Sequence, residues 1–298
     1  MGPRPNLTVV VPTLDRPAQL RACLVALGQG TGVAGEVEVV IADDGGGVDA
    51  GRAQAAAGAS MPVRVVGSGG HGPAAARNAG AAAAQAPLIA FTDDDCEPAP
   101  GWAAAMLVRH RSEPGALIGG RTVNGLGENP YSRAAQAITD AALAHHNGGP
   151  AGPSFFPSNN VALPAARFDE LGGFDETLRL AGGEDRDLCE RWSERGWPLT
   201  SEPRAMVSHS HPLSMRSFWR QQAAYGAGAY HHRRARSART GERRLEPSLT
   251  SGVFGTAARE TIADRDPTRL ALLAVWQAAN LAGFTRAALA RSESRAQV

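Results

Sequence analysis

The sequence contains no lysine, and all thirty of its basic residues are arginine. This absence excludes two large groups of proteins. Enzymes that hold pyridoxal phosphate need a lysine for the Schiff base, and Walker-type nucleotide-binding proteins need one in the P-loop. Together with the abundance of alanine, glycine and proline, the exclusive use of arginine indicates the coding bias of a GC-rich bacterium.

Cysteine is scarce as well. The three cysteines, Cys23, Cys96 and Cys189, are far apart and form no CxxC pair. This spacing indicates neither a disulfide framework nor a zinc site, and it fits a reduced, cytoplasmic setting. The residues that follow Met1 lack the basic and long apolar segments of an export signal, so we expect none.

Long apolar runs and an excess of one charge are also missing. The stretch 270–284 is apolar but too short for a membrane span of ~20 residues, and Gln277 and Asn280 interrupt it. We expect a helix there, packed on the protein or lying at a membrane surface. The net charge of +1 creates no field of one sign, and we expect no nucleic-acid partner.

Short β-branched runs alternate with alanine-rich stretches in the first hundred residues. The runs lack the alternation of half-exposed strands, which predicts parallel strands covered by helices on both faces. The pattern is that of a doubly wound α/β unit. The predicted strands are 7–11, 37–41, 63–66 and 88–92, and the predicted crossover helices are 17–27, 48–57 and 73–85.

The remainder of the chain predicts a looser arrangement, with strands at 116–123 and 160–163, helices at 131–146 and 184–195, and a last helical region from about residue 213. We therefore expect an α/β domain at 1–212, with a nucleotide-binding half (1–115) and an acceptor half (116–212). A helical C-terminal region would follow at 213–298. Its arginine-dense segment 233–247 predicts a flexible loop or tail.

Carboxylates gather directly after two of the predicted strands: Asp43 and Asp44 after the second, and Asp93, Asp94 and Asp95 after the fourth. In doubly wound folds these strand ends face the ligand crevice. Adjacent like charges repel, and Mg²⁺ or Mn²⁺ bridged to phosphate oxygens would relieve that repulsion. We therefore expect a metal and diphosphate site. The alternatives are a solvated turn for the triplet and a helix-capping turn for the pair.

Two further groups of polar residues lie in the second half. Glu184 and Asp185 follow a glycine pair at a predicted helix start, where acids favour the helix dipole even without a catalytic role. His209 and His211 are two residues apart in an extended segment, and so lie on the same side of it.

Six motifs occur in order at suitable spacing: VVVPTLDR, IADDGG, AARNAG, FTDDDCEPAPGW, ELGGFDE and GGEDRDLCERWSERGW. With them the chain resembles the bacterial family 2 glycosyltransferases of the GT-A type, from about Leu7 to about His211. The resemblance implies a GT-A fold, a doubly wound and mainly parallel sheet, with extra C-terminal helices. Leu188 stands where processive synthases have a glutamine before an Arg-Trp pair, which favours a single, non-processive transfer.

The resemblance also implies roles for individual residues. Asp185 would be the base that takes the acceptor proton, and Glu184 beside it is a second catalytic candidate. Asp95 and His209 would bind Mn²⁺ or Mg²⁺, with His211 an open alternative to His209. The nucleotide would contact Pro12, Thr13, Asp15, Asp43, Asp44, Arg77 and Asp94. The acceptor would contact Asn160 and Trp192, and Trp219 and Tyr225 lie on the acceptor side or in the core.

The implied reaction is an inverting, metal-dependent transfer of a sugar from a nucleoside diphosphate sugar to an acceptor hydroxyl. The products would be bacterial glycans, glycolipids or secondary-metabolite glycosides. One alternative is a non-catalytic nucleotide-sugar-binding protein. A second is a sugar nucleotidyltransferase, although such enzymes carry a basic loop that ends in lysine. The arginine-rich segment leaves a peripheral contact with the inner face of the membrane open.

Overall fold

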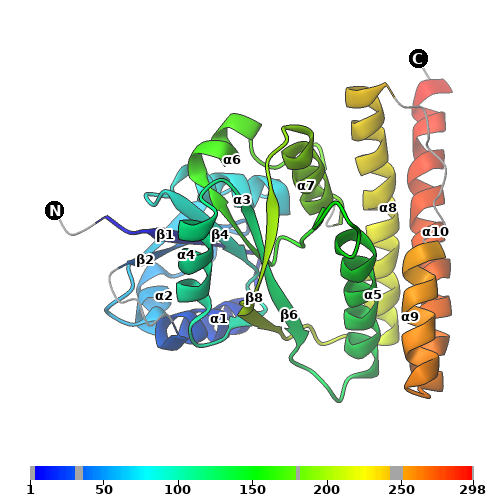
Figure 1. The fold of residues 1–298 in the computed structure, drawn as a ribbon, viewed down its shortest axis with the longest axis horizontal. Coiled ribbons are helices and arrows are strands. Elements are labelled where there is room, and N and C mark those ends of the chain that lie inside the picture. The colour runs from blue at the N-terminus through cyan, green and yellow to red at the C-terminus, as the bar shows by residue number, and fades with distance from the viewer. Residues whose placement is uncertain (1–3, 31–35, 179–181, 242–250, 297–298) are drawn as a thin grey trace.

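The structure is a computed structural model that describes residues 4–30, 36–178, 182–241 and 251–296. Its centre is an eight-stranded sheet in the order β3-β2-β1-β4-β7-β6-β8-β5 (Figure 1). The strands are β1 (Leu7–Thr13), β2 (Val37–Asp43), β3 (Val63–Gly67), β4 (Leu88–Thr92), β5 (Cys96–Pro98), β6 (Leu117–Asn124), β7 (Asn160–Pro164) and β8 (Leu199–His209).

Helices cover both faces of this sheet, and further helices form a layer at one end of the molecule. They are α1 (Pro17–Gly30), α2 (Ala50–Ala57), α3 (Pro73–Ala82), α4 (Trp102–Ser112), α5 (Pro130–Asn147), α6 (Ala165–Leu171), α7 (Glu184–Glu194), α8 (Met215–Thr240), α9 (Ser251–Ala263) and α10 (Pro267–Ala296). One apolar core joins α1, α2 and α4 to one face of the sheet. A second core joins α3, α6 and α7 to the other face.

The first four strands in the sequence, β1 to β4, are parallel to one another, as the apolar runs predicted. β1 and β2 are almost fully buried along their lengths, which explains why their sequences do not alternate. The register pairs Thr13 with Asp43 and Asp43 with Gly67. The ends of these strands, and the polar residues that follow them, therefore meet at one edge of the sheet.

The second half of the sheet is mixed. β7 runs antiparallel to both β4 and β6, whereas β6 is parallel to β8. The short strand β5 follows the acidic triplet directly and pairs antiparallel with β8, so that Cys96 lies opposite His209. This pairing brings the end of the triplet to the histidine segment, more than a hundred residues further along the chain.

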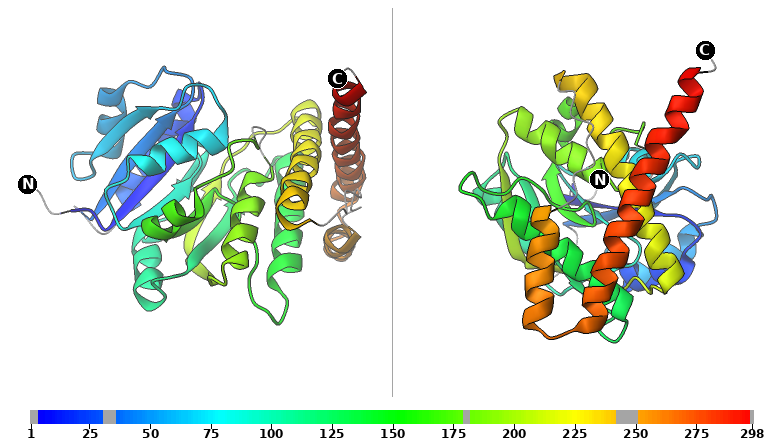
Figure 2. Two further views of the ribbon diagram at one scale, coloured as in Figure 1. Left: turned by 90° about the horizontal axis from the view of Figure 1, so that it is seen from above. Right: turned by 90° about the vertical axis from the view of Figure 1, so that its right-hand side faces the viewer.

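The C-terminal helices form a layer beside α5, at the end of the molecule opposite the N-terminus (Figure 2). Within this layer α8 and α10 pack against each other and cross at an angle. Leu273, Trp276 and Phe218 belong to the core that joins α8, α9 and α10 to α5. The crossing of α8 and α10 requires glycine. A Cβ atom on Gly226 would lie 1.9 Å from a backbone oxygen of α10, and one on Gly283 would lie 1.8 Å from a backbone oxygen of α8.

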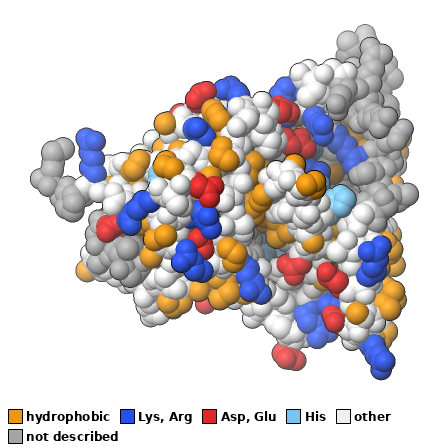
Figure 3. Space-filling model, in the orientation of Figure 1, with side chains coloured by type: hydrophobic (Ala, Val, Ile, Leu, Met, Phe, Trp, Pro, Cys, Tyr) orange, Lys and Arg blue, Asp and Glu red, His pale blue; other side chains and the backbone are white. Residues whose placement is uncertain are grey.

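Residues 270–284 form part of α10, as the apolar stretch predicted. One face of this helix is buried and another is exposed: Leu273 is in the core, whereas Leu281 is 46% exposed. Among the helices of the described ranges, none combines the length and apolar character that crossing a membrane requires. Acidic and basic side chains lie side by side over the surface in Figure 3, as expected from a net charge of +1.

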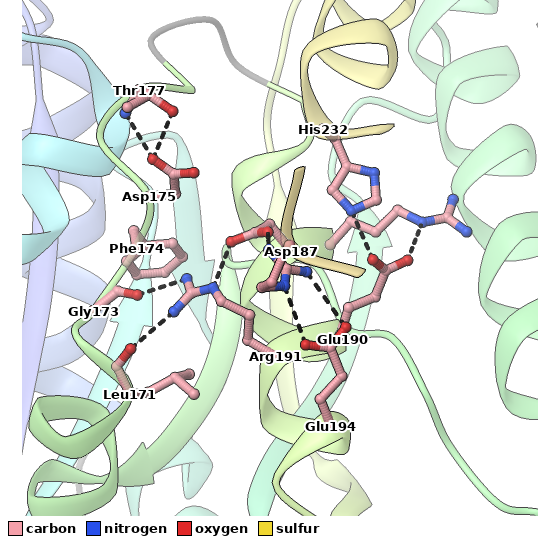
Figure 4. A network of polar contacts seen from close by, with 12 residues as sticks. Leu171, Gly173, Phe174, Asp175, Thr177, Asp187, Glu190, Arg191, Glu194 and His232 are labelled. Atoms are coloured by element: carbon pink, nitrogen blue, oxygen red, sulfur yellow. Dashed lines mark hydrogen bonds and ion pairs between the residues drawn. The ribbon is translucent and has the colours of Figure 1, made fainter. Parts of the chain in front are cut away.

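The prediction of a flexible segment at 233–247 is wrong for residues 233–240, which continue α8 to Thr240. The reason is charge pairing with α7. Arg239 contacts the buried carboxylate of Asp187 at 2.9 Å and the exposed carboxylate of Glu194 at 3.1 Å. Asp187 also receives Arg191 at 2.6 Å, so two arginines hold one buried acid between the helices (Figure 4). Residues 242–247 lie outside the described ranges.

Candidate active site

A cleft of about 1080 Å³ opens where the ends of β1, β2 and β4 face α7, α8 and α10. The carboxyl edge of the parallel strands forms one wall. The opposite wall consists of the N-terminus of α7 together with side chains from α5, α8 and α10. The crevice expected at the strand ends is thus present, and helices from the far end of the sequence enclose it.

The end of β1 and the acidic triplet are joined by direct hydrogen bonds. The hydroxyl of Thr13 donates to Asp94 at 2.7 Å. Arg16 contacts Asp94 at 3.2 Å and Asp95 at 3.1 Å, and its side chain is 45% exposed. Burial raises the pKa of Asp94 to about 6, against the effects of Thr13 and Arg16. Thr13 and Asp94, both predicted at the nucleotide site, line the cleft. Arg16 also lines it but was not predicted. Its position directly after the first strand, which ends beside the acidic triplet, could have indicated it.

Asp95, His209 and His211 form a candidate metal centre. One potential ligand atom from each lies within 4.8 Å of the others. The His209 Nε2 atom is 3.2 Å, and the His211 Nδ1 atom 2.9 Å, from the Asp95 carboxylate. Burial would raise the pKa of Asp95, but hydrogen bonds from both histidines outweigh it and hold the pKa well below its usual range. The sequence favoured His209 and left His211 open; both reach Asp95.

The donor set of this centre fits a divalent transition-metal ion. It offers one carboxylate and two imidazoles, and both histidines remain partly exposed to the cleft. Imidazole suits transition-metal ions, whereas Mg²⁺ takes oxygen ligands in octahedral geometry. Three protein ligands leave coordination positions for the oxygens of a substrate. The centre could therefore hold a divalent metal ion.

Asp44 lines the cleft at the end of β2. Its carboxylate accepts hydrogen bonds from the Ser68 hydroxyl at 2.5 Å and from the backbone N–H groups of residues 70–72 at 3.0 to 3.1 Å. Burial opposes ionisation, but these hydrogen bonds outweigh it and lower the pKa of Asp44. A charged carboxylate is thus fixed at the mouth of the crevice.

Of the other residues predicted to contact the nucleotide near Asp44, only some line the cleft. Pro12 lines the cleft, but Asp43 and Asp15 do not. Asp43 is buried and accepts three backbone N–H groups of the turn that follows it, at 2.8 to 3.0 Å. The turn alternative therefore describes Asp43 better than a nucleotide contact. Asp15 is exposed in a left-handed backbone conformation with φ of 53°.

Arg77 links the two acidic motifs. Its buried guanidinium contacts Asp93 at 2.7 Å and Glu184 at 3.1 Å. The guanidinium also lies over the ring of Phe174, with its central carbon 5.6 Å from the ring centroid. The sequence predicted Arg77 near the nucleotide, and it does line the cleft, but its contacts join the strand-end motif to the start of α7. Local sequence patterns do not predict this long-range pairing.

Glu184 and Asp185, at the start of α7, differ in their surroundings. Glu184 is buried against Arg77, and burial together with the charge of Asp185 raises its pKa to about 7. Asp185 lines the cleft, and burial raises the pKa of its carboxyl group. Gly182 has a φ of 99°, and a Cβ atom there would lie 2.4 Å from the ring of Tyr225. The glycine pair therefore lets α8 approach the two acids.

The predicted acceptor residues Asn160 and Trp192 do not line the cleft. Asn160 is buried, accepts the indole N–H of Trp102 at 2.8 Å and donates to the carbonyl of Ala205 at 3.0 Å. Trp192 is fully buried and packs edge-on against Trp197. Both predictions are wrong, because each side chain points into the core.

Other residues line the wall of the cleft opposite the strand ends. Ser158 and Asn159, just before β7, lie on it, as does Tyr225, which is 39% exposed. Trp219 is exposed but lies outside the cleft. Gln221, Gln277 and Asn280 add polar groups from α8 and α10. These three residues were not predicted, because their positions depend on how two helices that are distant in the sequence cross.

Comparisons with known proteins bear on this cleft. The sequence profile described as Glycosyl transferase family 2 matches residues 8–165. Pre-mycofactocin glycosyltransferase of Mycobacterium tuberculosis is 33% identical over 230 residues, which cover 75% of this chain and 47% of that protein. Validoxylamine A glucosyltransferase of Streptomyces hygroscopicus is 30% identical over 224 residues, 66% of this chain and 53% of that protein. The chain spans about half the length of these relatives.

A solved structure supports the fold. A mannosyltransferase from Pyrobaculum calidifontis, in complex with GDP-Man and Mn²⁺, matches with a TM-score of 0.63 over 95% of this chain and 87% of that one. The two sequences are 18% identical, so this likeness concerns the fold alone. The GT-A-type fold with additional C-terminal helices, expected from the motifs, is confirmed.

Proposed function

The chain belongs to glycosyl transferase family 2, and from this premise we propose that it moves a sugar from a nucleoside diphosphate sugar to an acceptor hydroxyl. One observation carries the proposal. Fixed carboxylates for a nucleoside, a triad suited to a metal ion and a carboxylate suited to a general base all line a single cleft.

Asp44 and Asp94 would contact the nucleoside of the donor. Asp44 is held by Ser68 and three backbone N–H groups, and Asp94 by Thr13, so neither needs to reorient before binding. Ionised carboxylates accept hydrogen bonds, which suits a base N–H and ribose hydroxyls. Preorganised acceptors of this kind lower the entropic cost of binding the donor.

Asp95, His209 and His211 would hold Mn²⁺. When bound, the ion would offset the negative charge that develops on the leaving diphosphate. Arg16 would assist, because its half-exposed side chain reaches both Asp94 and Asp95 and has room to turn toward the diphosphate. The positive charges on the floor of the cleft would thus lie on the leaving-group side of the sugar.

Asp185 would accept the proton of the acceptor hydroxyl as its oxygen attacks the anomeric carbon. Its raised pKa brings its basicity closer to that needed for proton transfer near neutral pH. Attack from the side opposite the diphosphate in one displacement inverts the anomeric centre. Glu184 would position the start of α7 through its ion pair with Arg77, which occupies one of its carboxylate oxygens.

The acceptor would be a small molecule that receives one sugar. The names of two relatives each refer to a particular acceptor compound, pre-mycofactocin and validoxylamine A. Leu188 stands where processive synthases have a glutamine, and its side chain is buried in the core. It therefore offers no polar group to a growing polymer. Both observations favour a single transfer in the synthesis of a secondary metabolite over chain extension.

The test is calorimetric titration of the purified chain with uridine, guanosine, thymidine and cytidine diphosphates, each with and without Mn²⁺. We expect binding of one nucleotide that depends on Mn²⁺ and is lost in Asp95→Asn. Asp185→Asn should retain this binding, yet fail to release nucleoside diphosphate from the matching nucleotide sugar.

Other results would favour the alternatives. Nucleotide binding without any turnover by the unaltered chain, across a panel of sugars and hydroxyl acceptors, would indicate a binding protein. Release of pyrophosphate from a nucleoside triphosphate and a sugar phosphate would indicate a nucleotidyltransferase. Failure to bind every nucleotide would overturn the donor site itself.

A further inference from the structure

One end of the cleft lies beyond Asp185 and is not used by the proposed donor site. Arg186 lines it from α7, and Arg233 and Arg236 line it from α8. Basic side chains gather between α7 and the upper part of α8 in Figure 3. Arginines from two helices therefore meet at the same part of the cavity wall.

One carboxylate lies among these cations. Glu190 contacts His232 at 2.9 Å (Figure 4), and it lies 3.6 Å from both Arg186 and Arg236. Three arginines thus face the same part of the cleft as this one carboxylate. Burial, and to a smaller extent the charge of Arg186, lowers the pKa of Arg233.

An apolar surface borders the arginines. The guanidinium of Arg233 lies over the ring of Phe284, 5.5 Å from its centroid. Phe155 and Leu281 also line the cleft, and Leu281 is 46% exposed. A ligand at this end would therefore find a flat apolar wall beside a group of cations.

The start of α7 packs against the part of α8 that precedes Arg233. Tyr225 lies against Gly182, and a Cβ atom on Gly183 would lie 3.3 Å from the Cβ atom of His232. Arg186 directly follows the proposed base, Asp185, and Arg233 directly follows His232. The arginines are therefore neighbours of the proposed base in the cleft.

We propose that this end of the cleft is the acceptor subsite, and that it recognises an acceptor carrying a carboxylate or phosphate beside an apolar body. Arg186, Arg233 and Arg236 bind the anionic group, Phe155, Leu281 and Phe284 contact the apolar body, and the reacting hydroxyl lies at Asp185. This inference rests on the proposed glycosyl transfer, which assigns the opposite end of the cleft to the donor.

The test uses three probes of one shape, 2-naphthoate, 2-naphthyl phosphate and the neutral 2-naphthamide, titrated calorimetrically into the full chain. We expect one anionic probe to bind at least tenfold more tightly than the amide. Arg233→Gln should weaken that binding about tenfold, the loss of one charge-assisted contact. Arg186→Gln should do the same.

Arg234→Gln is the matched control, because Arg234 is exposed on the same helix and does not line the cleft. It should leave probe affinity unchanged. Nucleoside diphosphate binding, measured on the same samples, reports separately on the proposed function and shows that each variant is folded. The carboxylate and phosphate probes distinguish the two anionic groups.

Three outcomes would overturn the acceptor subsite. The first is equal affinity for the anions and the amide, or no binding of any probe. The second is an equal loss in Arg233→Gln and Arg234→Gln. The third is that vesicles of phosphatidylglycerol, but no naphthyl anion, bind in a manner that depends on Arg233, which would assign the arginines to lipid headgroups. Nucleotide binding that persists in any of these cases leaves the proposed glycosyl transfer intact.

Discussion

The two walls of the cleft are built in different ways. The wall proposed for the donor (the donor wall) comes from the ends of neighbouring strands, with polar residues between Pro12 and Asp95 and with His209 and His211 at the end of β8. The wall proposed for the acceptor (the acceptor wall) comes from α5, α7, α8 and α10, which lie far apart in the sequence. Hydrogen-bonded register fixes the first wall, whereas side-chain packing between helices fixes the second.

This difference bears on how each wall tolerates change. A strand end cannot move without breaking the ladder on both sides, so the geometry for nucleotide and metal is rigid. Helices that pack through side chains can shift or change their surface residues at lower cost.

Two polar links hold α7 in place. Arg77 joins Asp93 of the strand-end motif to Glu184 of α7. Asp187 of α7 also receives Arg239 from α8 (Figure 4). The helix that carries the proposed base is therefore tied to the donor wall by one link and to α8 by the other.

The largest effect is expected from Asp185→Asn. Removing a general base should lower the rate of transfer about 100- to 10,000-fold while leaving nucleotide affinity unchanged. The base acts when deprotonated, and its pKa is raised. The unaltered enzyme should therefore lose activity as pH falls through that raised pKa. Rates measured against pH, with calorimetry of nucleotide binding as the control, check both statements; a variant that also fails to bind nucleotide would refute the separation of the two walls.

Asp95→Asn should have the next largest effect, on the donor wall. Loss of the carboxylate of the proposed metal triad should reduce Mn²⁺-dependent transfer about 1000-fold, since a metal ion contributes several kcal/mol of charge stabilisation. Mn²⁺ affinity, followed by electron paramagnetic resonance, should fall in parallel. Glu97→Gln is the control, because Glu97 is exposed two residues away and is not among the triad. Equal Mn²⁺ affinity in the two variants would count against the triad.

The donor wall could largely be predicted from the sequence. Its residues follow apolar runs directly, and in a parallel sheet the end of one strand lies beside the end of the next. Asp44, Asp94 and Asp95 follow such runs and do line the cleft, as does Thr13, which the family resemblance implied. Asp43 shows the limit of this reasoning, because two adjacent acids at a strand end alternate in direction and only one of them faces the cleft.

The acceptor wall could not be predicted in the same way. Asn160 and Trp192 were assigned to it from neighbouring motifs, yet both point into the core. Tyr225 and Asn280 lie on it because α8 and α10 cross at Gly226, a contact between residues more than fifty positions apart. Periodicity in one chain predicts helices but not the angle at which they cross.

Gly226→Ala tests whether that crossing can be disturbed by itself. The new methyl group would overlap a backbone oxygen of α10, so the free energy of unfolding should fall by about 1–3 kcal/mol, as is usual for overpacking. Gly255→Ala in α9 is the matched control. A Cβ atom there meets open space, and removal of a helical glycine should stabilise by about 0.5–1 kcal/mol. Denaturant unfolding measures both, and Gly226→Ala should retain nucleotide binding; its loss would show that the walls are not independent.

The smallest effect is expected at Asn159, and its neighbour Asn160 sharpens the contrast. Asn159 lines the acceptor wall, so Asn159→Ala should raise the KM for acceptor less than about tenfold, the range of one neutral hydrogen bond, without changing stability. Asn160 satisfies Trp102 and two backbone carbonyls inside the core, so Asn160→Ala should lower the free energy of unfolding by about 1–3 kcal/mol. Steady-state kinetics and thermal unfolding of the two variants separate these roles. An acceptor KM that responds to Asn160 and not to Asn159 would return the acceptor contact to the residue that the motif suggested.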